Sequence, residues 1–459
     1  MEKNAWKKYS LEELNEVEAL SISYKKFLDD AKTEREAVTE IIKRCENEGF
    51  KDLDFIVKNK SSLNKGDKVY VNNNGKSVVL FIIGEEDIEN GMNILGAHID
   101  SPRLDLKANT LYEEDGFAYF DTHYYGGIKK YQWVTLPLAI HGVVIKKDFT
   151  KIDIKLGEEE EDMVFGITDL LPHLAQEQMQ KKASEVITGE NLDILIGSRP
   201  LAGEEKEAVK KSILKILKEK YNIEEEDFLS AELEIVPAGH ARDFGFDRSM
   251  IMAYGQDDRI CAYTSFEAFL SIHDVPTKTL ACILVDKEEI GSVGATGMAS
   301  HFFNNAIMEI CSLLGKDAFM ALQRTLKHSK MLSSDVNAAY DPLYKEVMDK
   351  RNASFLGHGI AFCKYTGSRG KSGSNDADAE YVAELRKIMD DNHVSFQISE
   401  LGKVDAGGGG TIAYFLANYN VKVIDCGVGI LNMHAPWEIS SKIDVYEAYK
   451  GYIAFLKNA

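Results

Sequence analysis

A histidine and an aspartate two residues apart have spacing suited to metal chemistry. His98 and Asp100 lie in Gly96-Ala-His-Ile-Asp-Ser-Pro-Arg, which continues an apolar run. In an extended strand the two side chains share a face, so one can bind a metal while the other orients the imidazole. Taken alone, the pair fits a hydrogen-bonded core histidine beside a surface aspartate better.

Two adjacent glutamates form the second candidate. The apolar stretch 280–285 predicts a strand that runs into Asp286, and Glu288 and Glu289 follow. In a metal hydrolase, one carboxylate can bind the metal while its neighbour acts as general base on water. A solvated charged turn is the competing interpretation.

Two further aspartates, Asp257 and Asp258, stand just before an expected helix over 259–273. The helix dipole and the free N–H groups favour a carboxylate there. N-capping explains one aspartate and does not explain two.

The remaining candidates are Asp335 and His434. Asp335 lies in an expected polar loop after an apolar helix that ends near Leu332, and His434 follows an expected strand at 421–430. Singly, each fits a cap or a surface histidine. Together, carboxylates and two imidazoles near strand ends suit Zn²⁺ or a related divalent ion. Two ions sharing one bridging carboxylate would leave one histidine and one terminal carboxylate for each, and the residue count fits.

The elements that must position these residues follow from apolar periodicity. Two amphipathic helices are expected within 11–49. The other expected elements are strands at 54–57, 68–71, 78–83, 94–98, 279–285, 359–364 and 421–430, and helices at 259–273, 299–314, 376–391, 411–417 and 443–457. This alternation predicts an α/β fold with a doubly wound mixed sheet.

Between about 107 and 247 the pattern changes to short alternating segments around highly charged spans. We therefore predict a catalytic domain formed by 1–106 and 248–459, with a smaller β-rich domain, 107–247, inserted into it.

Composition excludes several classes of protein. Of the 459 residues, 44% are hydrophobic and 28% charged, as in globular chains, and the net charge of −20 argues against nucleic-acid and membrane partners. The longest apolar stretch, 133–145, is too short to span a bilayer, and the N-terminus does not look like a secretory signal. Six scattered cysteines without CxxC spacing argue against a zinc finger or a disulfide framework. We expect a soluble, cytoplasmic protein.

The motifs occur in an order that resembles the aspartyl aminopeptidase family of co-catalytic zinc metallopeptidases. The matching segments are GAHIDSPRLDLK (96–107), GQDDRICAYTSF (255–266), DKEEIGS (286–292), SSDVNAAYDP (333–342) and NMHAPWE (432–438). Each is ordinary, but the ordered set is specific and spans most of the chain.

The resemblance implies a role for each candidate residue. His98 and Asp335 would hold one metal, Glu289 and His434 the other, with Asp257, rather than Asp258, as the bridge; Glu288 would be the general base, and Asp100 would orient His98. The expected cofactor is two Zn²⁺ per subunit, although these ligand types also accept Co²⁺ or Mn²⁺.

The resemblance also implies peptide substrates, an acidic N-terminal residue as the preferred one, and a homo-oligomer, a tetrahedral assembly of twelve subunits. The inserted segment matches the family's dimerisation domain in place. Two departures stand out. Pro172-His-Leu-Ala-Gln-Glu lacks the second histidine that the family uses across subunits, and 237–247 differs from animal and fungal members, which bears on acidic specificity.

Two loops are candidates for binding substrate. Lys364 and Arg369 could meet an acidic side chain or a free carboxylate, with a solvated basic loop as the alternative. The glycine run 407–410 with Thr411 opens an expected helix, so the backbone N–H groups around Gly409 could hold a substrate carbonyl, or the run could be a hinge.

The sequence thus predicts a metal-dependent aminopeptidase in which Glu288 takes a proton from water and returns it to the leaving amine. One alternative is another binuclear amide hydrolase, of the deacetylase or carboxypeptidase type. The other is a non-catalytic metal-binding assembly protein. Dependence on a free N-terminal amine separates an aminopeptidase from the first of these.

Overall fold

The computed structural model describes residues 4–367 and 369–459. The chain forms two compact units. The first contains Met1–Asp100, Ala241–Met433 and Glu438–Ala459, and the second contains Ser101–His240 and His434–Trp437. The second unit therefore begins six residues before the expected insertion at 107 and includes four residues from near the C-terminus.

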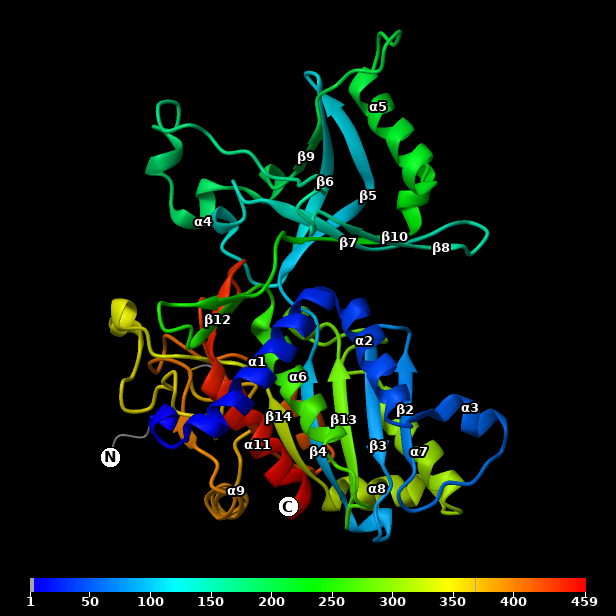
Figure 1. The fold of residues 1–459 in the computed structure, drawn as a ribbon, viewed down its shortest axis with the longest axis vertical. Coiled ribbons are helices and arrows are strands. Elements are labelled where there is room, and N and C mark those ends of the chain that lie inside the picture. Colours follow the sequence, from blue (N-terminus) through cyan, green and yellow to red (C-terminus); the bar gives the residue numbers. More distant parts are fainter. Residues whose placement is uncertain (1–3, 368) are drawn as a thin grey trace. The chain divides into compact units, whose positions relative to one another are not determined.

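The first unit is built on a nine-stranded mixed sheet (Figure 1). The order is β1-β2-β3-β13-β4-β14-β18-β16-β17, and neighbours in the central run β13-β4-β14-β18 are parallel. The strands are β1 (Lys51–Asp52), β2 (Lys68–Asn73), β3 (Ser77–Ile82), β4 (Met92–His98), β13 (Thr279–Val285), β14 (Lys330–Ser334), β16 (Ile360–Cys363), β17 (Phe396–Ser399) and β18 (Lys422–Gly427). Carboxyl ends of four parallel strands thus meet at one edge, where ligands bind in sheets of this kind.

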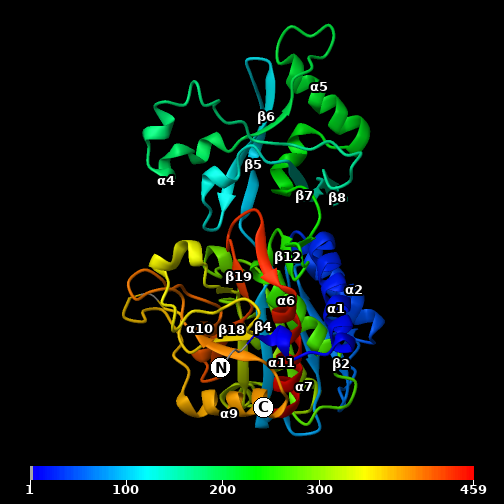
Figure 2. The ribbon, with the colours of Figure 1, turned by 60° about the vertical axis from the view of Figure 1, so that its left-hand side comes forward.

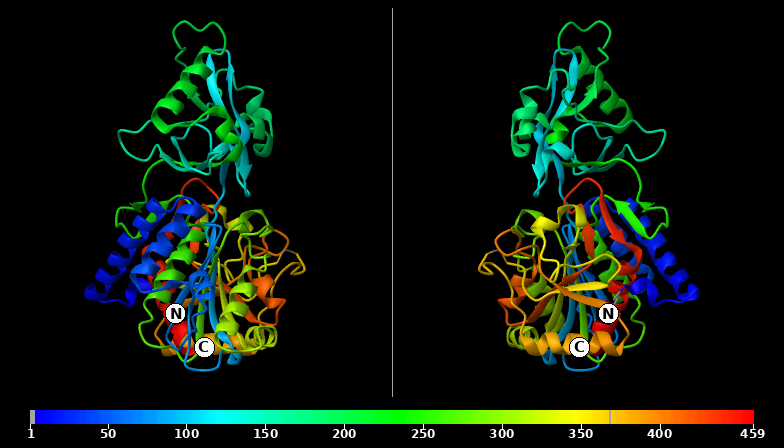
Figure 3. Two further views of the ribbon diagram at one scale, coloured as in Figure 1. Left: turned by 90° about the vertical axis from the view of Figure 1, so that its right-hand side faces the viewer. Right: turned by 90° about the vertical axis from the view of Figure 1, so that its left-hand side faces the viewer.

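Both faces of this sheet are buried, which explains the continuous apolar runs in its strands. Leu280, Cys282 and Leu284 of β13 belong to one core cluster, whereas the alternate residues Ala281 and Ile283 belong to the other. The helices on the first face are α1 (Leu11–Asp30), α2 (Glu34–Asn47), α6 (Gln256–Leu270), α9 (Ala379–Asp391) and α11 (Lys442–Asn458). Those on the second are α3 (Leu53–Lys58), α7 (Phe302–Leu313), α8 (Ala318–His328) and α10 (Ala413–Ala417) (Figure 3). The α/β fold class is confirmed.

Local signals account for where the first two helices begin. Ser10 caps α1 and Thr33 caps α2, and in each case the glutamate three residues later, Glu13 or Glu36, completes a capping box.

Three expected elements were wrong. The strand expected at 54–57 is helix α3, because Asp52 caps it by accepting the N–H of Asp54. The helix expected to end near Leu332 is α8, which ends at His328, and the following residues form β14. A short apolar run cannot distinguish helix from strand: the Asp52 cap favoured helix in the first case, and pairing with β4 and β18 gave strand β14 in the second. The stretch 421–430 forms two strands, β18 and β19 (Gly429–Leu431).

A second sheet of five short strands completes this unit. Its order is β11-β12-β20-β19-β15, with bounds β11 (Arg242–Phe244), β12 (Met250–Ala253), β15 (Asn337–Ala338) and β20 (Glu438–Ser441).

The second unit contains a six-stranded antiparallel sheet, ordered β8-β7-β10-β5-β6-β9 (Figure 2). Its elements are β5 (Arg103–Glu114), β6 (Phe117–Tyr125), β7 (Leu138–Ile145), β8 (Lys151–Leu156), β9 (Ile194–Gly197) and β10 (Ala231–Pro237), with helices α4 (Ala183–Val186) and α5 (Ala208–Ile216). Across the described part of the chain, no helix combines the length and hydropathy needed to cross a membrane.

Candidate metal centre

His98 is the last residue of β4 and is buried. Its Nδ1 lies 3.3 Å from Oδ1 of Asp100 and 3.0 Å from the carbonyl oxygen of the same residue. These contacts fix the imidazole through one nitrogen and leave Nε2 to face other groups.

Glu288 and Glu289 occupy a single 3₁₀ turn, Glu288–Ile290, just beyond β13. The residues on either side of the turn have a left-handed backbone conformation, with φ of 70° at Lys287 and 96° at Gly291. The N–H groups of Glu288 and Glu289 donate to the two carboxylate oxygens of Asp100, at 3.1 and 3.2 Å. The turn thereby brings a Glu288 carboxylate oxygen within 3.8 Å of His98 Nε2.

Asp257 and Asp258 lie at the start of α6, which begins three residues earlier than expected. Asp257 donates its N–H to Glu438 at 3.0 Å, and its Oδ1 lies 3.3 Å from His98 Nε2. Asp258 accepts the N–H of His98 at 3.4 Å through Oδ2, and its buried Oδ1 has no hydrogen-bond partner among the described residues.

Asp335 follows β14, and the adjacent strand β18 positions it. Its N–H donates to the carbonyl oxygen of Cys426 at 2.8 Å, and its Oδ1 lies 3.8 Å from His98 Nε2. The side chains form two potential ligand groups, each with ligand atoms within 4.8 Å of one another: His98, Asp258 and Asp335, and His98, Asp257 and Glu289. The structure thus brings together six of the seven residues that were expected to act as ligand, base or orienting group, Asp100 and Glu288 included.

The electrostatics of the cluster show uncompensated negative charge. Burial lowers the pKa of His98, but the carboxylates of Asp100, Asp257 and Glu288 outweigh it and raise that pKa well above its ordinary value. Burial also raises the pKa of Asp335 well above its usual range, and neighbouring carboxylates raise it further.

These observations fit a divalent cation. Buried carboxylates this close to one another need a positive charge, and an imidazole among carboxylates is a donor set that zinc accepts. The buried Oδ1 of Asp258, which lacks a hydrogen-bond partner in the described structure, shows the same unmet need.

His434 belongs to the second unit. There its Nδ1 lies 2.8 Å from the carbonyl oxygen of Gly127. Its expected role as a metal ligand remains a prediction.

The expected substrate-binding residues lie in two loops of the first unit. Lys364 Nζ is 3.6 Å from the Asp376 carboxylate, and Arg369 lines a pocket together with residues of 400–407. Gly409 donates its N–H to the carbonyl oxygen of Thr366 at 3.0 Å, which ties the two loops together.

Asp425, which sequence reasoning missed, is buried on β18 and accepts a hydrogen bond from the hydroxyl of Thr411. Burial raises the pKa of Asp425 to about 7, and the negative charge of Glu288 also raises it. A carboxylate inside the apolar run 421–430 was the signal that could have identified it.

Comparisons with known proteins give matches over nearly the whole chain. A family model described as "Aminopeptidase I zinc metalloprotease (M18)" matches residues 27–456. A probable M18 family aminopeptidase 1 from Clostridium acetobutylicum is 62% identical over 457 residues, which cover 99% of this chain and 98% of the relative.

Solved structures show the same fold. The crystal structure of an M18 family aminopeptidase from Thermotoga maritima has a TM-score of 0.94 at 48% identity and covers 99% of both chains. A dodecamer of mApe1 from S. cerevisiae has a TM-score of 0.76 at 20% identity, covering 96% of this chain and 97% of that one.

Proposed function

The chain belongs to the aminopeptidase I (M18) family of zinc metalloproteases, and we propose that it uses two metal ions to release N-terminal residues from peptides. The preferred N-terminal residues are Asp and Glu. Its membership of this family and its sequence identity to bacterial aminopeptidases show that the protein is a zinc metallo-aminopeptidase. The observation that supports the two-metal site is the convergence of acidic side chains on His98 in two overlapping ligand groups.

In this site His98 and Asp335 would hold one ion, Glu289 and His434 would hold the other, and Asp257 would be the ligand common to both. The place of Asp257 is supported because it lies 3.3 Å from His98 Nε2 and also shares a ligand group with Glu289. When bound, zinc acts as a Lewis acid on a carbonyl group and makes water a stronger acid.

Glu288 is the general base. Its carboxylate takes a proton from the attacking water and later gives it to the leaving amine. This role is supported by the Glu288 carboxylate oxygen 3.8 Å from His98 Nε2 and by the turn that fixes its backbone to Asp100. Asp100 orients His98 and holds the turn.

Basic residues in the loop after β16 support the acidic preference. Lys364 and Lys371 both form ion pairs with the Asp376 carboxylate, with Nζ–O distances of 3.6 and 3.0 Å. Arg369 lies in the same loop. An acidic substrate side chain would compete for these cations. Gly409 and Thr411 contact the substrate backbone through other groups of that loop, because the Gly409 N–H already donates to Thr366 and the Thr411 hydroxyl to Asp425.

The chain forms a homo-oligomer, a tetrahedral dodecamer, with the second unit as its dimerisation domain. Support comes from large apolar side chains that are exposed within one segment of that unit: Leu170, Leu171, Leu174 and Met179 are each at least half exposed. The dodecamer of the S. cerevisiae neighbour is a second line of support. The expected cytoplasmic location stays a prediction.

Release of the first residue from matched peptides tests the proposed activity. The peptides begin with Asp, Glu, Leu, Lys and acetyl-Asp, and each is assayed with and without a chelator. Chelator-sensitive release from the Asp and Glu peptides alone is expected. Release from Leu or Lys peptides would refute the acidic preference, and cleavage of acetyl-Asp peptides would refute the requirement for a free amine.

A further inference from the structure

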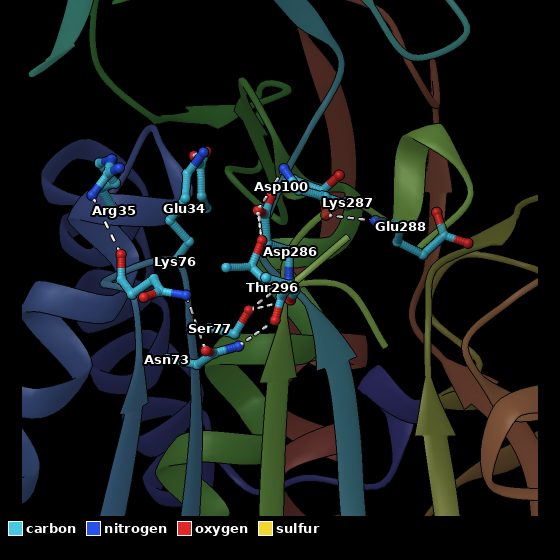
Figure 4. Close-up of polar contacts among 12 residues, drawn as sticks. Glu34, Arg35, Asn73, Lys76, Ser77, Asp100, Asp286, Lys287, Glu288 and Thr296 are labelled. Atoms are coloured by element: carbon cyan, nitrogen blue, oxygen red, sulfur yellow. Dashed lines mark hydrogen bonds and ion pairs between the residues drawn. The ribbon is translucent and has the colours of Figure 1, made fainter. Parts of the chain in front are cut away.

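Asp286 is a buried carboxyl group that the proposed mechanism does not use. It follows β13 directly and stands two residues before Glu288. Its Oδ2 accepts a hydrogen bond from Thr296 Oγ1 at 2.6 Å and lies 3.2 Å from Lys287 Nζ. Its Oδ1 is buried without a hydrogen-bond partner in the described part of the chain. Figure 4 shows Asp286 between Asp100 and Thr296.

Asp286 and Thr296 stand at the two ends of the loop that carries Glu288 and Glu289. The backbone of Asp286 forms a parallel bridge with Gly297, and its N–H lies 3.3 Å from the carbonyl oxygen of Thr296. Ser77 of β3 joins both ends, because its hydroxyl accepts from Asp286 N–H and donates to the Thr296 carbonyl. The loop 286–297 is thus closed at its base.

The interior of the loop is also tightly packed. A Cβ atom at Gly297 would lie 2.2 Å from the carbonyl oxygen of Ser292, and one at Gly294 would lie 3.1 Å from Cε of Lys287. Lys287 therefore contacts the Asp286 carboxylate and also packs closely against Gly294. The position of Glu288 depends on these tertiary contacts, since its own turn is only three residues long.

The surroundings of Asp286 are acidic. Burial raises its pKa, and the negative charges of Glu34 and Asp100 raise it further, although Thr296 and Lys76 act against this. Lys76 lies 3.1 Å from a Glu34 carboxylate oxygen. A neutral side chain of the same shape therefore suits the site, provided that it offers Thr296 an acceptor.

We propose that Asp286 is a positioning residue, which holds the Glu288–Glu289 turn in its catalytic place by closing the loop onto Thr296. The inference rests on the proposed function, in which Glu288 is the base. Asp100 fixes the turn from one side by accepting the N–H groups of Glu288 and Glu289. Asp286 fixes the base of the loop from the other side.

The test uses the full-length, zinc-loaded protein and the variants D286A, D286N and T296V. For D286A and T296V we expect kcat on an Asp peptide to fall roughly 10- to 100-fold with KM within about twofold, as for a misplaced catalytic group. Because Glu289 lies in the same turn, zinc is expected to bind more weakly, so the kinetics are measured at saturating zinc; amide hydrogen exchange becomes faster within 286–297. D286N retains most of the activity, because its amide oxygen can accept from Thr296.

Two variants serve as matched controls. T325V removes a buried threonine hydroxyl on α8, and D274A removes an exposed carboxylate; both are expected to leave kcat and exchange in the loop unchanged. Where D286A does not fold, T296V decides.

Wild-type kcat or wild-type loop exchange in folded D286A or T296V would overturn the proposal, as would a D286N variant as impaired as D286A. Activity in E288Q would instead refute the role of Glu288, and exchange within 286–297 would still report on Asp286.

Discussion

The carboxylate of Asp100 accepts the backbone N–H of Glu288 at 3.1 Å. The same carboxylate lies 3.3 Å from His98 Nδ1, so one side chain joins the end of β4 to the turn beyond β13. The imidazole and the expected base are therefore positioned by a shared group.

Removing this link should weaken catalysis more than folding. For D100A we expect kcat/KM to fall roughly 10- to 100-fold, as is usual when a group that orients a metal ligand is lost. Steady-state kinetics and zinc content of the purified protein measure it. D54N, on the exposed start of α3, is the control. A D100A protein with wild-type kinetics would contradict the link.

E288Q separates metal binding from proton transfer. The amide keeps the shape of the side chain but cannot take a proton, so we expect kcat to fall by roughly 10²- to 10⁴-fold. Zinc content and the thermal midpoint should match the wild-type values. Near-normal turnover in E288Q would show that another group is the base.

Asp257 and Asp258 should differ in their effect on zinc content. Asp257 lies between His98 and Glu289, so D257N is expected to lose bound zinc. If Asp257 alone bridges the ions, D258N, which still accepts the N–H of His98, retains zinc although Asp258 belongs to the other ligand group. Zinc per subunit, measured by elemental analysis after dialysis, distinguishes them. Equal loss in both variants would assign Asp258 to the metal as well.

The free energy of unfolding should depend on pH because of the buried carboxyl group of Asp444. Burial raises the pKa of this carboxyl from 3.8 to about 8, although the N–H groups of Gly357 and Gly359 bond to it. Between these values the folded state binds more protons than the unfolded state, so stability falls as pH rises.

The variant D444N removes this titration. Relative to D444N, the thermal midpoint of the wild type should decrease from about pH 4 to about pH 8 and then level off. Parallel curves for the two proteins over that range would show that Asp444 titrates normally.

Most regular elements were predictable from local pattern. The strand expected at 279–285 matches β13 at both ends, and the amphipathic helices within 11–49 are α1 and α2. Apolar periodicity and capping residues are local signals, so they need no knowledge of the partner surface. The helix α3 and the strand β14 escaped prediction because short apolar runs suit either structure.

Residue types and order along the chain determined the chemistry: a histidine with a nearby aspartate, paired acids, and carboxylates near strand ends, in the order that resembles one peptidase family. Only the tertiary structure decided which of them meet. Parallel pairing of β13, β4 and β14 sets the strand ends side by side, and this brings Glu288 and Asp335, 47 positions apart in the sequence, to the same imidazole nitrogen. The burial of Asp286 was equally invisible beforehand, because it depends on which segments cover the residue and not only on its neighbours along the chain.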